Sequence, residues 1–192
     1  METRNSILAI TIVLLSSTFV FAQKAKNDLD RGYSFDGRNF VVSLNTGFFG
    51  NSYGYGKASG APVLLSLEYG LHRYVGISLY GGMLHRKPVW GENAYKLDVY
   101  TGGGRINFHL YHLIDDLVKI NLRGDIIDVY GNLAVGFDHY DTNLPVRTKY
   151  SYYITGGAGV RVYPIKKVQG LGFNMEFSTI LSPWLLGLNY KF

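Results

Sequence analysis

The sequence predicts an all-β protein, an eight-stranded antiparallel up-and-down transmembrane β-barrel. Eight segments of roughly 8–12 residues alternate apolar and polar side chains, and this length suits the about 9–11 residues that a tilted strand needs to cross a bilayer. The last segment keeps one apolar face up to the final residue, Phe192. Beyond the N-terminal region no apolar run is long enough for a spanning helix, and an exported chain without such a helix can cross a membrane only as a closed barrel.

Composition agrees with a single β domain. The chain has 192 residues, of which 17% are charged, with 24 Gly, 16 Tyr and 11 Phe. This mixture suits close-packed strands with aromatic rims better than a helical bundle. The absence of Cys excludes disulfides, thiolate metal sites, Cys nucleophiles and a lipidated-Cys anchor. The net charge of +5 is scattered without a Lys/Arg run, so we expect attraction to anionic lipopolysaccharide or a solvated surface rather than nucleic-acid binding.

The N-terminal residues 1–22 have the pattern of a cleaved secretory signal. Arg4 is followed by an apolar run from Ile7 to Phe21, and Ala22 provides a small residue at the cleavage site. The run is shorter than the about 20 residues of a membrane anchor. Residues 23–38 are polar and mixed in charge, which predicts a periplasmic lead-in. We expect residues 39–192 to form the barrel.

The first four strands are expected at 39–49, 62–69, 74–84 and 97–108. Each places apolar side chains on one face and mainly Gly, Ser, Asn or Thr on the other. The fourth contains three consecutive glycines, for which close strand approach is a better explanation than phosphate binding. The predicted outward residues are Phe40, Val42, Leu44, Phe48, Val63, Leu65, Leu67, Tyr69, Val75, Ile77, Leu79, Met83, Tyr100, Gly102, Gly104, Ile106 and Phe108.

The last four strands are expected at 128–138, 152–163, 172–181 and 185–192. The terminal strand closes the barrel, so its partner must be the first strand. The predicted outward residues are Val129, Leu133, Val135, Phe137, Ile154, Ala158, Val160, Val162, Phe173, Met175, Phe177, Leu186, Leu188, Tyr190 and Phe192.

An even strand count puts both termini on the periplasmic side. Loops 50–61, 85–96 and 139–151 then lie outside the cell, and the shorter turns 70–73 and 164–171 lie inside. Aromatic residues gather near both rims, as interfacial anchoring requires. The inner belt comprises Phe40, Tyr74, Phe108, Tyr163, Phe173 and Phe192, and the outer belt Phe48, Phe49, Tyr100, Phe137, Tyr152, Tyr153 and Trp184.

Segment 109–127 is long for a periplasmic turn. Its apolar residues, among them Leu110, Leu113 and Leu117, recur at helical spacing. Two interpretations remain open: a short amphipathic helix, or an irregular turn with extensions of the flanking strands.

Four charged residues fall on the inward face of the strands: Glu68, Arg105, Arg161 and Glu176. Eight strands enclose an interior that side chains can fill, and charges buried there must be paired. Their formal charges sum to zero. We therefore predict a lumen charge network, assisted by Asn107, Asn132 and Asn174, that closes the lumen; a gated ion path is the alternative.

No catalytic, metal or cofactor site is predicted. His109 and His112 could share a helical face, but no Cys or close-set Asp pair accompanies them. None of the five histidines is followed two residues later by Ser, and no G-x-S-x-G occurs. The outer loops carry aromatic and basic residues that suit contacts with acidic sugars or proteins, although a solvated rim explains them as well. These loop contact candidates are Tyr53, Tyr55, Lys57, Arg86, Lys87, Trp90, Arg147 and Lys149.

The alternating ending Leu186, Leu188, Tyr190 and Phe192 resembles the C-terminal signal of bacterial outer-membrane β-barrel proteins. Glu68-Tyr69-Gly70-Leu71 followed by Val75-Gly76-Ile77-Ser78 resembles a hairpin of the same broad family. Over about 39–192 the chain resembles small barrels of the OmpA/OmpX type, without the peptidoglycan-binding domain of OmpA. The resemblance implies a place in the outer membrane of the Gram-negative envelope and contact with lipid and lipopolysaccharide. It also implies that the barrel-assembly machinery recognises the alternating residues Leu186, Leu188, Tyr190 and Phe192.

The sequence thus favours a non-enzymatic, porin-like outer-membrane barrel with a plugged polar lumen and a structural or interaction role, in which extracellular proteins or glycans contact the loops. Three alternatives remain. A lipid-modifying enzyme of the outer membrane would need a His and a Ser close together in sequence. A narrow pore would need an open lumen. A soluble periplasmic lipocalin-like binding protein would turn its apolar face inward.

Overall fold

The computed structural model describes residues 38–47, 57–58, 61–87, 97–111, 114, 126–142, 149–164 and 170–192. The predicted signal 1–22 and the lead-in, apart from Arg38, lie outside these ranges. No helix among the described residues is long and apolar enough to cross a membrane.

The strands are β1 (Phe40–Gly47), β2 (Lys57–Ala58), β3 (Val63–His72), β4 (Val75–Lys87), β5 (Leu97–His109), β6 (Ile127–Thr142), β7 (Tyr150–Val162), β8 (Leu171–Ser178) and β9 (Trp184–Lys191). Each neighbouring pair is antiparallel. β1 pairs with β3 on one side and with β9 on the other, and β4 pairs with β5, so the sheet closes on itself. β2 is a short addition that pairs with the end of β4.

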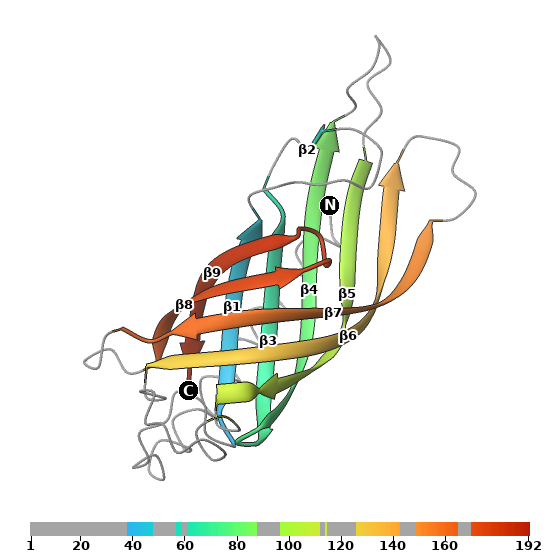
Figure 1. The fold of residues 1–192 in the computed structure, drawn as a ribbon. Coiled ribbons are helices and arrows are strands. Elements are labelled where there is room, and N and C mark those ends of the chain that lie inside the picture. The colour runs from blue at the N-terminus through green and yellow to red at the C-terminus, as the bar shows by residue number, and fades with distance from the viewer. Residues whose placement is uncertain are drawn as a thin grey trace, which may run out of the picture.

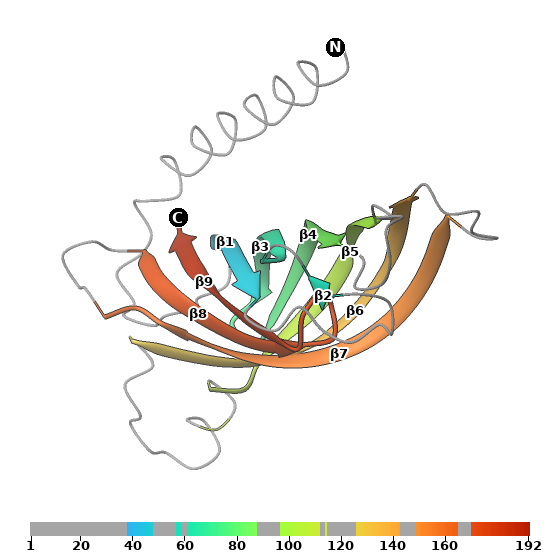
Figure 2. The same ribbon diagram turned by 90° about the horizontal axis from the view of Figure 1, so that it is seen from above.

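The predicted fold class, a closed antiparallel barrel of eight strands, is confirmed. The expected closure of the last strand on the first is confirmed too, because Leu188 lies opposite Leu44 and Lys191 opposite Val41. Figure 1 shows β1, β3, β4 and β5 behind the crossing strands β6 to β9, and Figure 2 shows the same two walls from above. We call the end where β4 and β6 finish the upper end, and the end with the Arg73–Tyr74 turn and Phe192 the lower end.

The alternation of faces agrees with the sequence pattern. In β8 every second residue is buried, beginning with Gly172, while Phe173, Met175 and Phe177 are exposed. The exposed side is strongly apolar, with Leu79 at 70% and Ile154 at 76% exposure. The buried side is mostly polar. It includes Asn39, Ser43, Asn45, Ser66, Glu68, Ser78, Thr101, Arg105, Asn107, His109, Asp128, Asn132, Arg161, Asn174, Glu176, Ser178 and Asn189.

Several strand ends differ from the prediction. β3 continues to His72 through a register shift between Gly70 and His72, so the lower turn is at Arg73 and Tyr74 and not at 70–73. β4 and β6 extend further upward, to Lys87 and Thr142. β8 ends at Ser178 instead of 181, and Leu181, with a positive φ of 60° that a strand cannot contain, lies in the turn that follows.

Segment 109–127 is only partly described. His109 is the last residue of β5, and Leu110, Tyr111 and Ile114 are helical. The fourth strand therefore does not extend past His109. The remaining residues up to 125 lie outside the described ranges.

The aromatic belts need two corrections. Tyr163 is 7% exposed and faces the lumen, and the Tyr153 hydroxyl bonds with Tyr80 inside the barrel at 2.9 Å. Their position near a rim predicts that both rings lie on the outer surface, but their place in the alternation turns them inward. Phe48 and Phe49 lie outside the described residues. Tyr100, Phe108, Phe137, Tyr152, Phe173 and Trp184 are exposed.

Inward glycines make room for large side chains across the lumen. A Cβ on Gly159 would lie 2.4 Å from the ring of Tyr130, and one on Gly103 would lie 2.4 Å from the Tyr80 hydroxyl. Outward glycines have space instead, since a Cβ on Gly104 would meet nothing nearer than 3.8 Å. The glycine-rich strand thus serves close packing on its inner side.

The upper part of the lumen contains an apolar cluster. The turn between β8 and β9 folds inward, so that Ile180 and Leu181 are 2% and 7% exposed. They pack with side chains from several strands. The cluster comprises Leu64, Tyr80, Leu84, Val99, Ala134, Ile180, Leu181 and Leu185.

Candidate functional site: the charged lumen

The four inward charges come together in two contacts. Arg105 on β5 pairs with Glu176 on β8, and Arg161 on β7 pairs with Glu68 on β3. In each case the partners are far apart in sequence and reach each other across the lumen. All four residues are at most 3% exposed.

Arg105 and Glu176 are held by further polar groups. Nη1 of Arg105 donates to both carboxylate oxygens of Glu176, at 2.8 and 2.9 Å. Its Nε donates to Ser78 at 3.0 Å and its Nη2 to Ser66 at 3.2 Å. The Tyr130 hydroxyl donates to Glu176 at 2.9 Å. Charge-assisted bonds of this kind offset the loss of water around a buried ion pair.

Arg161 and Glu68 belong to a four-membered group with His109 and Asp128. Nη1 of Arg161 lies 3.4 Å from Asp128, and its guanidinium stacks 4.4 Å above the ring of Tyr130. His109 lies between the two carboxylates, with Nε2 at 2.9 Å from Glu68 and Nδ1 at 2.9 Å from Asp128.

The geometry around His109 indicates a doubly protonated imidazolium. Ionised carboxylates only accept hydrogen bonds, so a ring nitrogen that faces one must donate. With His109 charged, the network contains three cations and three carboxylates and is formally neutral. Its members are Arg105, Arg161, His109, Glu68, Asp128 and Glu176.

Sequence reasoning did not place His109 and Asp128 in this network. Strand alternation contains the missing signal. His109 has the same parity as Arg105 and Asn107 in β5, and Asp128 has the same parity as Tyr130 in β6. Both residues stand at strand ends next to segment 109–127, where the expected strand boundaries interrupted the alternation.

The three expected asparagines behave differently. Asn174 donates to Asn45 at 2.8 Å and Asn107 to Ser78 at 3.2 Å. Asn132 is 7% exposed, but neither amide atom has a hydrogen-bond partner. Nε of Arg161 and one side-chain atom each of Ser43 and Asn189 are likewise buried without one. Buried polar groups of this kind are normally satisfied by internal water.

The terminal residues proposed as an assembly signal line the outer surface of β9. Leu186, Leu188 and Tyr190 are 38%, 51% and 40% exposed, and the Phe192 ring contacts the ring of Tyr190 at 4.7 Å between centroids. Of the loop contact candidates, Tyr53, Tyr55, Trp90 and Arg147 lie outside the described residues. Lys57, Arg86 and Lys87 are in β2 and β4, with only their backbones described, and Lys149 is exposed beside β7.

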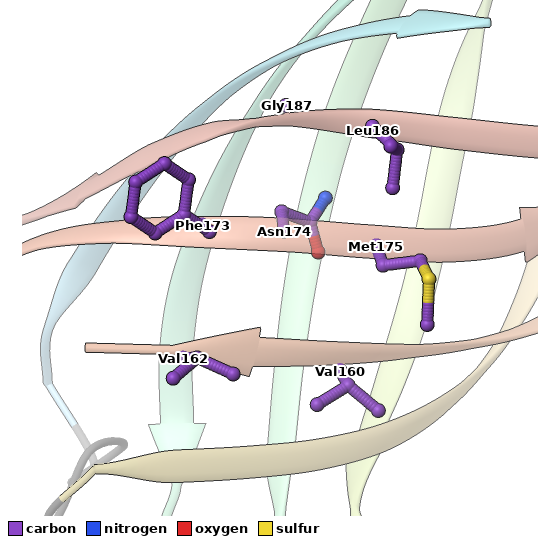
Figure 3. Close-up of a pocket in the computed structure, with 7 residues that line it drawn as sticks. All are labelled: Val160, Val162, Phe173, Asn174, Met175, Leu186 and Gly187. Carbon is purple, nitrogen blue, oxygen red and sulfur yellow. The ribbon is translucent and has the colours of Figure 1, made fainter. Parts of the chain in front are cut away.

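A shallow apolar groove crosses the outer face of β7, β8 and β9. Figure 3 shows Phe173 and Met175 on its central strand, with Val160 and Val162 on one neighbour and Leu186 on the other. Asn174 and Gly187 form its floor, because the Asn174 side chain turns into the lumen. The groove belongs to the apolar outer band and does not reach the charged network.

Among the described residues, the outer face also carries one His–Asp contact, between Nδ1 of His85 and Asp98. Such a pair could orient a base in a lipid-modifying site. Asp98 lies opposite Asp141 on β6, and the next outward-facing pair below is Met83 with Tyr100. None of these neighbouring residues is a serine or threonine that could act as a nucleophile. The lumen network, by contrast, joins cations to carboxylates and connects five strands, namely β3 and β5 to β8.

No protein-family model matches the chain, and no curated protein matches it in sequence. Similarity appears among solved structures. The attachment invasion locus protein Ail of Yersinia pestis, crystallised with the heparin analogue sucrose octasulfate, superposes with a TM-score of 0.51 at 15% identity, covering 82% of this chain and all of Ail. The outer membrane protein OprG of Pseudomonas aeruginosa gives a TM-score of 0.53 at 11% identity, covering 85% of this chain and 99% of OprG. At these identities the similarity concerns the fold: the chain has the eight-stranded barrel found in small outer-membrane proteins.

Proposed function

We propose that the chain is a non-enzymatic integral protein of the bacterial outer membrane, with a plugged lumen and a structural or contact-making role. The observation that carries this proposal is the inverted distribution of side chains, apolar outside and polar inside. In water, the exposed apolar band would cost about 25 cal/mol for each Å² of surface. Hydrocarbon removes this cost, and the pairing of β1 with β9 removes the free sheet edges at the first and last strands.

The same observation argues against a lipocalin-like binding protein. That alternative requires an apolar cavity and a solvated exterior. Here charged groups such as Arg105 and Glu176 are buried in the lumen, while Leu79 and Phe173 are exposed outside.

Location can be tested by cell fractionation. We expect the protein in the detergent-extracted outer membrane, with its N-terminus at Gln23 after removal of residues 1–22. Heating should slow its migration in SDS gels, because a folded barrel resists SDS until it is boiled. Recovery from the soluble periplasm without detergent would overturn the proposal.

Two layers of side chains inside the barrel support the proposed plugged lumen. The polar layer contains the paired charges around Arg105 and Arg161, and the apolar layer contains Ile180 and Leu181. We expect no stable ion conductance when the purified protein is inserted into planar bilayers. Steady single-channel currents would favour the narrow-pore alternative.

Contacts with outside molecules are assigned to the upper loops. Ail, which has the same fold, was crystallised with a sulfated sugar analogue. The loop candidates here include five cations: Lys57, Arg86, Lys87, Arg147 and Lys149. We therefore propose acidic glycans, including the sugars of lipopolysaccharide, as the partner class. Retention on immobilised heparin should fall with salt and with the joint replacement of these five residues by Gln, and retention that survives both changes would contradict the assignment.

A further inference from the structure

The upper part of β7 has a strand neighbour on one side only. β6 pairs with β7 along its whole length, up to His139 opposite Tyr150. β8 pairs with β7 only from Gly157 to Val162, because β8 ends at Ser178 and the following turn folds into the lumen. In Figure 1 the upper ends of β6 and β7 continue past the β8–β9 turn. Within the described chain, residues 150–154 thus form an open sheet edge.

The hydrogen bonds identify which backbone groups face this edge. The carbonyl of Lys149 accepts from the Tyr140 amide at 2.9 Å, and the amide of Tyr163 donates to Ile126 at 2.7 Å, so odd-numbered residues of β7 face β6. Successive residues of a strand turn their backbone groups to opposite edges. The N–H and C=O groups of Tyr150, Tyr152 and Ile154 therefore point away from β6.

The side chains agree with an uncovered edge. Tyr152 is 84% and Ile154 76% exposed, and Tyr150 is 58% exposed. Monomeric proteins usually protect such edges with charged residues, proline or a bulge. Residues 150–154 contain no charge or proline, and their register with β6 has no shift.

The position of the edge limits what can cover it. Ile154 is in register with Val135, and Val135 with Gly104 and Leu79, within the outer apolar band. Unpaired N–H and C=O groups facing hydrocarbon cost several kcal/mol each. Lipid can cover the side chains but cannot form hydrogen bonds with the unpaired N–H and C=O groups. An extended peptide can cover the side chains and also form these hydrogen bonds. Just below, the Thr155 hydroxyl bonds with that of Thr179, so the open stretch ends there.

We propose that residues 150–154 of β7 bind an extended, uncharged peptide segment of a partner protein by strand addition, along the line that β8 would follow beyond Ser178. The inference rests on the proposed function: if the barrel makes contacts with other proteins, strand addition is the way in which it binds them. The partner segment would place apolar or aromatic side chains beside Tyr152 and Ile154, and small or hydroxyl-bearing ones on the side of Ser151 and Tyr153.

A second copy of this chain does not fit the edge. Two β7 edges pairing antiparallel would be related by a twofold axis perpendicular to the sheet. That axis would turn one barrel upside down relative to the other. Copies inserted into one membrane share their orientation, so two copies do not pair antiparallel through this edge, and we assign the occupant to a different protein.

The open edge can be tested by amide hydrogen exchange of the purified protein in detergent micelles, followed by NMR. We expect the amides of Tyr152 and Ile154 to exchange at least tenfold faster than those of Ser151 and Tyr153, which bond to β6. Equal and slow exchange of all four would show that the edge is already covered and would overturn the inference.

Binding can be tested with a fluorescent heptapeptide of alternating Thr and Val, followed by anisotropy. The matched control peptide carries N-methyl groups on every second amide, on the side that would face β7. Losing two or three backbone hydrogen bonds of about 1 kcal/mol each should weaken binding by about tenfold or more. Equal binding of both peptides, or no binding of the first, would contradict strand addition.

Two protein variants separate backbone from side-chain contacts. Tyr152→Pro removes an N–H that points to the open edge and leaves the β6 ladder intact. Tyr152→Thr removes the same ring and keeps the N–H. The proline variant should lose about tenfold more affinity for the Thr/Val peptide than the threonine variant, with unchanged heat-dependent gel mobility, and equal losses would indicate simple apolar adsorption. If the protein is recovered from the outer membrane but the amides of Tyr152 and Ile154 exchange slowly, only this inference is refuted. If the protein is recovered from the soluble periplasm, the proposed function is refuted, whatever the result of the hydrogen-exchange measurement.

Discussion

Arg105 depends on a single carboxylate. Its side chain and that of Glu176 are both fully buried, and Glu176 is its one acidic contact among the described residues. Glu176→Gln should lower the free energy of unfolding by about 3–5 kcal/mol, because an uncompensated charge remains in the lumen. Urea unfolding in lipid vesicles, followed by tryptophan fluorescence, would measure it. The exposed Asp141 gives a control, since Asp141→Asn should change stability by less than about 0.5 kcal/mol.

The pair can also be removed as a whole. The double variant Arg105→Met with Glu176→Met replaces both charges by apolar side chains. Its stability should recover most of the loss seen with Glu176→Gln, because the penalty comes from the charge left behind. A double variant as unstable as the single one would mean that the pair itself stabilises the barrel.

Gly103 and Gly104 are adjacent in β5 but face opposite sides. A Cβ on Gly103 would lie 2.2 Å from the Val135 carbonyl and 2.4 Å from the Tyr80 hydroxyl, whereas one on Gly104 stays 3.8 Å from its nearest neighbour. Gly103→Ala should destabilise the barrel by about 1–3 kcal/mol, as overpacking does, and Gly104→Ala should be nearly neutral. The same urea titration would compare them. Equal effects would show that the inner glycine is not required by packing.

At the residue scale, alternation allows most of the lumen to be predicted. The inward placement of Glu68, Arg105, Arg161 and Glu176 follows from parity alone. Which cation meets which carboxylate does not follow, because it depends on the barrel's register and on side-chain reach across the lumen. Parity also turns Tyr163 and Tyr153 inward, and it decides their orientation although both lie near a rim where aromatic belts are expected.

At the scale of elements, the β8–β9 turn decides how the upper lumen is filled. Ile180 is 2% exposed within an apolar cluster. Ile180→Ala should cost about 2–4 kcal/mol, because it leaves a cavity that the surrounding strands cannot close. Ile77→Ala, on the outer face, should cost less, since lipid chains can fill the space. Equal losses in the unfolding titration would mean that Ile180 contributes no more than an exposed residue.

The inward turn is also the element that the sequence predicted least well. A continuous strand is predicted over 172–181, although the alternation of outward apolar and inward polar residues stops at Ser178 and is reversed at Thr179 and Ile180. The strand stops at Ser178, and Leu181 adopts a positive φ in the turn that follows. A local conformation of this kind depends on the space available inside the barrel. The sequence shows the turn through Ser182 and Pro183 but not its direction.

At the scale of the whole molecule, the closing strand has two separable roles. The amide of Phe192 donates to the Phe40 carbonyl at 2.9 Å, which fastens the end of the chain to β1. Phe192→Ala keeps this backbone bond. It should therefore leave refolding into detergent micelles nearly unchanged, while lowering the amount in the outer membrane of living cells several-fold, if the terminal ring is read during assembly.

Immunoblots of membrane fractions would measure the cellular effect, with Phe173→Ala as an exposed aromatic control away from the terminus. Similar losses for both variants, or a refolding defect specific to Phe192→Ala, would argue that the ring matters for packing and not for assembly.

The inward β8–β9 turn also determines where the barrel can display foreign sequence. An epitope inserted between Ile180 and Leu181 would pull both side chains out of the lumen and would have no open space to occupy. An epitope inserted between Arg73 and Tyr74 would extend an exposed hairpin at the opposite end, facing the periplasm if the barrel is oriented as proposed. As a carrier for surface display, this barrel is therefore restricted to its other upper connections, and the turn that looks simplest in the sequence is the one to leave untouched.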